Sequence, residues 1–175
     1  MKPDLTLNEM RILILAVGNR SRGDDGVAPI MLDRVANKIN GLANVEFVIE
    51  EVYQLQPEHI YDIDMADAVL IVDAATDLDA NIRLSPIHAS KNVEVGIHTV
   101  SPVNLLGLYQ NLFKKAPPPT LLLSIKACEF GFTEKLSRTC QDSLAEAELV
   151  ALDKLANPHS FFNHSGSSRA MQGRR

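Results

Sequence analysis

Apolar and polar positions along this chain separate strand-like runs from helix-like ones. Apolar or alternating runs of strand length stand at residues 11–17, 44–53, 68–75 and 120–130. Between them, apolar residues recur at helical spacing over residues 25–40, 57–67, 101–115 and 137–156. Strands that alternate with helices are typical of a mostly parallel sheet with helices on both faces. The pattern therefore predicts an α/β protein in which helices lie on both faces of the sheet.

Capping signals sharpen two of these helices. Ser101 is followed by a proline, which predicts an N-cap and a first helical position there. The last helix is expected to start at Ser137 and to stop before the Asn-Pro pair that follows it. Between residues 77 and 97 the pattern is short and mixed, with "NIRLSPI" and "NVEVGI" as candidate short strands.

Length and composition favour one domain. The chain has 175 residues, 46% of them hydrophobic, which is enough for one good core. No repeat or second boundary appears, so we expect a single domain over residues 1–157. Residues 158–175 are small and polar without a period, and we expect them to form a disordered tail.

Charge and cysteine usage exclude several classes of partner. The net charge of −5 offers no basic face to nucleic acid or to an anionic membrane. No apolar run approaches the roughly 20 residues that cross a bilayer, and the first ten residues lack the apolar stretch of a signal peptide. Cys128 and Cys140 are spaced neither as a CxxC pair nor as a zinc knuckle. We therefore expect two reduced thiols in a cytoplasmic, monomeric protein.

The turn after the first strand carries unusual chemistry. In this fold class ligands bind beyond the carboxyl ends of the strands, and here the sequence reads "GNRSRGDDG" from Gly18 to Gly26. Its glycine spacing is not that of a dinucleotide loop, and two aspartates would repel a phosphate. Asp24 and Asp25 instead suggest a cation site, although either could simply cap the next helix.

Two further polar residues are expected at the same edge of the sheet. Asp73 follows the buried "AVLIV", where a charge is costly unless it is paired, metal-bound or hydrated. A turn or cap role remains open for it, and Asp77 in the same loop competes for any function. His98 precedes the helix at Ser101 and on its own would more often be structural. Together two carboxylates and one imidazole suit a divalent transition metal with open positions for substrate.

Four blocks of the chain resemble the hydrogenase maturation peptidases, which trim the carboxyl terminus of nickel–iron hydrogenase large subunits. "ILAVGNRSRGDDGVAP" is similar to their G-N-x-x-x-x-D-[DE]-G-x-G signature. "ADAVLIVDAATD", "IHTVSPVNLLGLYQNLFKKAPP" and "IKACEFGFTEKLSRTCQDSL" are similar to their later blocks, in the same order. The likeness covers roughly residues 11–155. It implies a three-layer α/β/α sandwich around a mostly parallel twisted sheet.

The resemblance also implies a ligand set and a substrate. The family holds a metal with an acid of the first motif, the aspartate of the second and the histidine of the third, here Asp25, Asp73 and His98. The metal is nickel, supplied by the precursor of the hydrogenase large subunit, and cleavage follows its insertion. Gly18, Asn19 and Asp24 would position the substrate, and no catalytic residue beyond the ligands is assigned.

Two departures from the family pattern affect these assignments. The second glycine of the signature is replaced by Ala28, and His98 is chosen over the fallback His88 only by its spacing to the following leucines. The chain offers no other protease centre, since it has neither a G-x-S-x-G elbow nor an HExxH helix.

Two rivals remain from other classes. A signalling receiver domain combines an acid pair, an aspartate on strand three and a lysine on strand five, which Asp24, Asp25, Asp73 and Lys126 imitate. However, five residues separate Gly18 from the acid pair, whereas receiver acids follow their strand directly. A non-catalytic α/β binding module that uses the same acidic cluster is the second rival.

Overall fold

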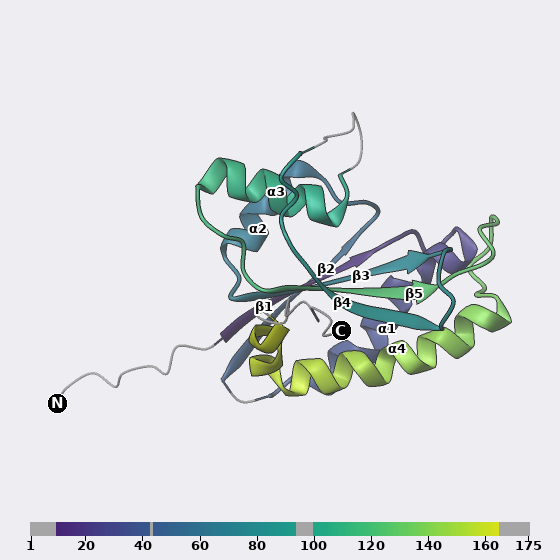
Figure 1. Ribbon diagram of the computed structural model, residues 1–175. Helices are drawn as coiled ribbons and strands as arrows, with labels where there is room; N and C mark the ends of the chain where they lie inside the picture. Colours follow the sequence, from purple (N-terminus) through teal and green to yellow (C-terminus); the bar gives the residue numbers. More distant parts are fainter. Residues whose placement is uncertain (1–9, 43, 94–99, 165–175) are drawn as a thin grey trace, which may run out of the picture.

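The computed structural model describes residues 10–42, 44–93 and 100–164, and a five-stranded sheet forms its centre (Figure 1). The strand order is β2-β1-β3-β5-β4, and every pairing is parallel except that of β4 with β5. The strands are β1 Met10–Val17, β2 Val45–Val52, β3 Ala68–Ala75, β4 Ile82–Ile87 and β5 Thr120–Lys126. The mostly parallel sheet predicted from the sequence is therefore confirmed.

Helices cover both faces of this sheet, which completes the expected three-layer α/β/α sandwich (Figure 1). One face carries the two long helices, α1 Val27–Ile39 and α4 Arg138–Ala156. The other face carries α2 Ile60–Asp64 and α3 Pro102–Phe113. Three short 3-10 helices complete the fold: η1 Gly23–Gly26, η2 Pro57–His59 and η3 Pro158–His164.

The apolar run of β1 explains why this strand lies inside the sheet. Successive side chains of a strand point to opposite faces, and here both faces are covered. Ile12 and Ile14 enter the core beneath α1 and α4, whereas Leu13 and Leu15 enter the core beneath α2 and α3. All four side chains are almost fully buried. A continuous apolar run is therefore what a central parallel strand requires.

The predicted helix starts are confirmed by their caps. The Ser101 hydroxyl accepts a hydrogen bond from the backbone N–H of Asn104 at 3.4 Å, at the start of α3. The Ser137 hydroxyl accepts one from the backbone N–H of Cys140 at 3.2 Å, at the start of α4.

None of the helices in the described part of the chain has both the length and the apolar character needed to cross a membrane.

The mixed region after β3 contains one strand, and its direction matters for the site. "NIRLSPI" forms β4, which runs antiparallel to β5 and pairs Ile87 with Thr120. Pro86 is tolerated because β4 is the last strand of the sheet, where an N–H is not needed on the outer side. The second candidate strand, "NVEVGI", falls mostly on residues 94–99, outside the described residues.

The expectation of a disordered tail from residue 158 is wrong for its first part. Residues 158–164 form η3, and the Phe161 side chain is only 1% exposed in the core beneath α1 and α4. Burial of this ring contributes about 2–3 kcal/mol toward the ordering of the segment. The domain therefore extends at least to residue 164, while residues 165–175 lie outside the described residues.

We predict that Phe161→Ala lowers the free energy of unfolding by about 3 kcal/mol, because it leaves a cavity in the core. Phe162→Ala is the matched control, since that ring is 41% exposed and its loss should cost clearly less. Urea denaturation followed by circular dichroism measures both. Equal stability of Phe161→Ala and the wild type would show that η3 does not contribute to the core.

Candidate functional site

The carboxyl ends of the parallel strands form the edge of the sheet at which the candidate residues gather, and the arrowheads of β3 and β5 point to it in Figure 1. The turn after β1 begins at Gly18, and β3 brings Asp73 level with the end of β1, because Ala16 pairs with Val72. On its other side Asp73 pairs with Ser124 of β5. The fold thus brings two of the three predicted ligand positions, Asp25 and Asp73, to one edge.

The turn from Gly18 to Gly26 folds back tightly on itself. Gly18 has φ of +143°, and a Cβ there would stand 1.9 Å from the backbone oxygen of Asp25. Only glycine permits this close approach. Asp25 is held next to it, because the backbone N–H of Asn19 donates to its carboxylate at 3.1 Å. The guanidinium of Arg22 lies 4.0 Å from the same carboxylate oxygen.

Asn19 contributes to the turn with its side chain as well as its backbone. Its side-chain oxygen accepts a hydrogen bond from the backbone N–H of Ser21 at 2.9 Å, and its backbone oxygen accepts one from Arg22 at 3.0 Å. This is an Asx-turn arrangement, which asparagine favours. The Asp25 side chain remains 23% exposed at the end of this structure. Gly18 and Asn19 therefore shape the turn that presents Asp25.

Asp24 has a different role from its neighbour, and its predicted role in positioning a substrate is not compatible with its burial. The residue is fully buried. Its carboxylate accepts hydrogen bonds from the backbone N–H groups of Cys128 at 2.8 Å, Glu129 at 2.9 Å and Ser137 at 2.6 Å. The Ser137 hydroxyl donates a fourth at 2.7 Å. Asp24 thus binds the loop between β5 and α4 rather than a ligand.

Helix capping also fails as an explanation for either aspartate. The N-cap of α1 is Gly26, and no side chain caps it. Burial alone would raise the pKa of Asp24, but the hydrogen bonds from Cys128, Glu129 and Ser137 hold that pKa below its ordinary value. Asp24 is therefore ionised at neutral pH, and its charge is shared among four donors.

The ionised form of Asp73 is electrostatically disfavoured by its surroundings. Burial raises the pKa of its carboxyl to about 6, a hydrogen bond from the backbone of Ala74 opposes that shift, and the negative charge of Asp25 adds to it. The charge of Asp25 thus disfavours ionisation of Asp73 at the same edge of the sheet. A buried carboxylate beside a second acid is stabilised when a cation lies between them, so both residues fit a metal-binding role.

The histidine assignments have different outcomes. His98, the predicted third ligand, lies outside the described residues. The fallback His88 is wrong on position, because it follows Ile87, which pairs with Thr120 at the amino end of β5. Thr120 lies four positions before Ser124, the partner of Asp73, which is about 13 Å along the strand. Within the described ranges no three His, Cys, Asp or Glu residues are grouped to hold a metal.

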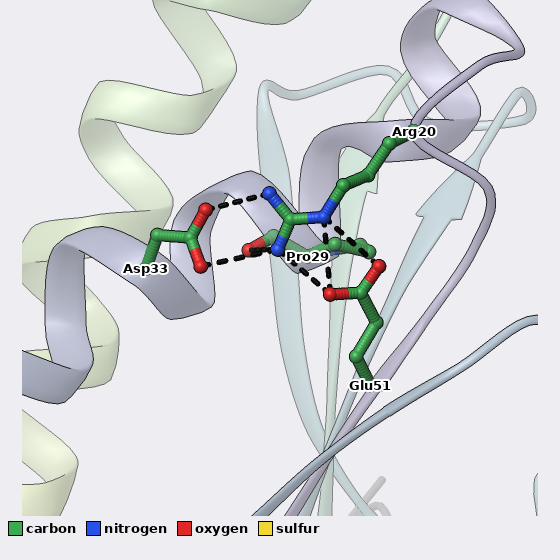
Figure 2. A network of polar contacts seen from close by, with 4 residues as sticks. All are labelled: Arg20, Pro29, Asp33 and Glu51. Atoms are coloured by element: carbon green, nitrogen blue, oxygen red, sulfur yellow. Dashed lines mark hydrogen bonds and ion pairs between the residues drawn. The ribbon is translucent and has the colours of Figure 1, made fainter.

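A charged network at the base of the turn was not anticipated from the sequence (Figure 2). The guanidinium of Arg20 donates to both carboxylate oxygens of Glu51 at 2.7–3.0 Å and to Asp33 at 2.6 and 3.1 Å. It also donates to the backbone oxygen of Pro29 at 3.1 Å. These bonds to Arg20 hold the pKa of Asp33 below its ordinary value. Arg20 therefore fastens the turn to β2 and α1.

The receiver-like rival does not fit this geometry. A receiver needs both acids of its pair available to a cation, whereas all the hydrogen bonds of the Asp24 carboxylate stabilise the interior. Six residues, 18–23, also separate the end of β1 from the acid pair, whereas receiver acids follow their strand directly. Asp25 and Asp73 remain as the described candidates for cation binding.

The fold and site together define an α/β/α sandwich with two carboxylates at the carboxyl edge of its sheet. Among the solved structures similar to it are hydrogenase maturation enzymes. The hydrogenase maturating endopeptidase HybD from E. coli superposes with a TM-score of 0.63 and 17% identity, over 85% of this chain and 94% of that one. The [NiFe] hydrogenase maturation protease HycI from Thermococcus kodakarensis KOD1 gives 0.61 and 16%, over 83% and 92%.

A third similar structure is the [NiFe] hydrogenase maturation protease HybD from Thermococcus kodakarensis, with a TM-score of 0.54 and 21% identity over 84% of this chain and 99% of that one. No protein-family model matches the chain, and no curated protein matches its sequence. The structural likeness establishes the fold over most of the chain.

We predict that Asp24→Asn lowers the free energy of unfolding by about 2–3 kcal/mol at pH 7, because an amide cannot accept all four hydrogen bonds. Asp25→Asn is the matched control and should cost less, since that carboxylate is partly exposed. The stabilisation from Asp24 should be lost as the pH falls through its lowered native pKa. Urea denaturation at several pH values measures this, and equal effects of both substitutions would contradict it.

Asp73→Asn should have the opposite effect on stability. Because the native pKa of Asp73 is raised to about 6, the protein loses stability as the pH rises from the ordinary carboxyl pKa to about 6, and the amide removes this penalty. In metal-free buffer at pH 7.5 we expect the variant to gain about 2 kcal/mol over the wild type, and the gain should vanish near pH 4. Asp77→Asn, an exposed acid of the same loop, is the control. A gain independent of pH would contradict the electrostatic cause.

Proposed function

We propose that this protein is an endopeptidase that removes a short carboxyl-terminal peptide from the nickel-loaded precursor of a [NiFe]-hydrogenase large subunit. The observation that carries the proposal is the pair Asp25 and Asp73, held at the carboxyl edge of a sheet with the fold of hydrogenase maturation endopeptidases. Sequence similarity to the same family in four ordered blocks supports it independently.

The chain's own residues supply an incomplete ligand set. Asp25 is oriented by the backbone of Asn19, and Asp73 is fixed by the pairing of β3 with its neighbours on both sides. Two carboxylates, with His98 as the proposed third ligand, leave coordination positions of a divalent ion open. The nickel of the precursor would fill this set, so that it forms part of the substrate rather than a resident cofactor.

This arrangement explains why cleavage would depend on nickel. Without the ion, the negative charges of Asp25 and Asp73 repel each other, and neither carboxylate can polarise a carbonyl. A bound divalent ion supplies the Lewis acidity that polarises a carbonyl or activates water. Asp25 and Asp73 then hold the ion-bearing segment at the edge of the sheet, and the peptide bond beside it becomes the one that is hydrolysed.

We place this reaction in the cytoplasm. Both cysteines are free thiols, and Cys128 is exposed. An exposed free thiol is compatible with a reducing compartment, where thiols are kept from forming disulfides.

The test mixes the purified protein with nickel-loaded and nickel-free large-subunit precursors and follows their mass. We expect loss of the carboxyl-terminal peptide from the nickel-loaded form alone, and no cleavage of casein. Equal cleavage of both precursor forms would refute the dependence on nickel. Cleavage of neither, with binding retained, would favour the non-catalytic binding module.

Substitutions test which acids at this edge of the sheet contribute to cleavage. Asp25→Asn and Asp73→Asn should each reduce the cleavage rate at least about 100-fold while preserving the fold, because the amide keeps the shape but loses the charge that meets the ion. Asp77→Asn should cleave like the wild type, since its exposed side chain lies in the same loop without belonging to the proposed site. A comparable loss of cleavage rate in Asp77→Asn would contradict the assignment of the site to Asp25 and Asp73.

A further inference from the structure

The turn between β1 and α1 carries two arginines, Arg20 and Arg22, whose environments differ. The guanidinium of Arg20 donates to Glu51, Asp33 and the backbone oxygen of Pro29, and these bonds engage all three of its nitrogens (Figure 2). The Arg22 side chain, in contrast, is 56% exposed. Arg20 is therefore held in place by the fold, whereas much of the Arg22 side chain is in contact with water.

The charged partner of Arg22 is Asp25, the residue that the turn presents at the candidate site. Nη1 of Arg22 lies 4.0 Å from Oδ2 of Asp25, the same oxygen that accepts the N–H of Asn19 at 3.1 Å. A separation of 4.0 Å is too long for a hydrogen bond, so the two groups attract each other only as charges. Exposed pairs of this kind contribute no more than about 1 kcal/mol. The guanidinium thus lies beside Asp25 without being fixed there.

The backbone of Arg22 is fixed, although its side chain is loosely paired. Its N–H donates to the backbone oxygen of Asn19 at 3.0 Å, and the residue forms an isolated parallel bridge with Thr133 in the loop after β5. The N–H of the next residue, Gly23, donates to the backbone oxygen of Thr133 at 2.6 Å. The main chain of Arg22 therefore stays in place, and rotation of its side chain decides whether the guanidinium lies beside Asp25.

This placement makes the guanidinium a competitor of any cation that binds Asp25. In the described part of the chain, Arg22 is the only basic side chain that pairs with either Asp25 or Asp73. A divalent ion at Asp25 has a positive charge beside it as long as Arg22 keeps this position, and the two positive charges repel each other. Arg22 therefore lowers the affinity of the two acids for a dissolved ion.

We propose that Arg22 is a resident counter-ion of Asp25, which disfavours the binding of dissolved divalent ions and is displaced by the nickel of a docked precursor. The inference rests on the proposed function, because a site that meets its ion on the substrate has to be empty when the substrate arrives. A docked partner presents its ion at an effective concentration on the order of millimolar. That concentration displaces a pair as weak as Arg22 and Asp25, whereas hydrogen bonds like those of Arg20 would exclude the ion.

The experiment titrates the metal-free, full-length protein with Ni²⁺ and follows binding by calorimetry at low ionic strength. Arg22→Gln should bind the ion about 5-fold more tightly than the wild type, because it removes a positive charge beside Asp25. Arg22→Lys keeps the charge and should stay within about 2-fold of the wild type. Arg34→Gln is the matched control and should bind like the wild type, since Arg34 is 51% exposed and pairs with Glu148 instead.

A double-mutant cycle tests whether Arg22 acts through Asp25. In the Asp25→Asn background, Arg22→Gln should no longer raise the affinity for Ni²⁺, because the carboxylate for which the two cations compete is absent. The gain in Arg22→Gln should also shrink in 1 M salt, where the Debye length falls to about 3 Å. A merely structural role of Arg22 predicts the opposite result, a loss of affinity in Arg22→Gln.

Cleavage of nickel-loaded precursor by the wild type is measured separately, so the two proposals can fail independently. Equal affinities of the wild type and Arg22→Gln for Ni²⁺, or no binding by either, would overturn the role of Arg22 even if the precursor is cleaved. Failure to cleave would overturn the proposed function, while a gain in Arg22→Gln that depends on Asp25 would still uphold the competition. An equal gain in Arg34→Gln would reveal a general effect of net charge and overturn the inference.

Discussion

The buried carboxylate of Asp24 is the interaction on which the site depends. Its four hydrogen bonds join three segments that are far apart in the sequence: η1, the loop after β5, and the start of α4. Ser137 takes part twice, because its hydroxyl donates to Asp24 and accepts from the first turn of α4. An ionised group in the interior is tolerated only when such donors surround it. The geometry of the edge therefore follows from one internal anion.

This anchor explains how two adjacent aspartates acquire different tasks. Asp24 points inward to backbone donors, so its charge is satisfied and its pKa is low. Asp25 points along the turn, where a single N–H of Asn19 and the guanidinium of Arg22 contact it. The first aspartate builds the turn and the second is presented by it. The two aspartates are therefore not interchangeable, because only the environment of Asp24 supplies the donors that a buried carboxylate needs.

The sequence was sufficient for the elements whose signals are local. The apolar run of β1 and the caps at Ser101 and Ser137 predicted their elements closely, because period and capping chemistry act within a few residues. Contacts between distant segments were not predictable in this way. Three features arise only when distant segments of the chain pack together: the burial of Asp24, the hydrogen bonds from Arg20 to Glu51, and the burial of Phe161 in the core. The direction of β4, which removes His88 from the site, was likewise not readable from its residues.

The ionised carboxylate of Asp73 lowers the stability of the fold but is the form that could bind a cation. Asp73 would be easier to accommodate as a neutral residue, since burial and the charge of Asp25 both disfavour its ionised form. A cation that binds between the two acids relieves their repulsion. The free energy gained by that relief adds to the attraction between the cation and the carboxylates. Under the proposed function, the same repulsion would disfavour substrates that bring no ion, and this would contribute to selectivity for a nickel-loaded precursor.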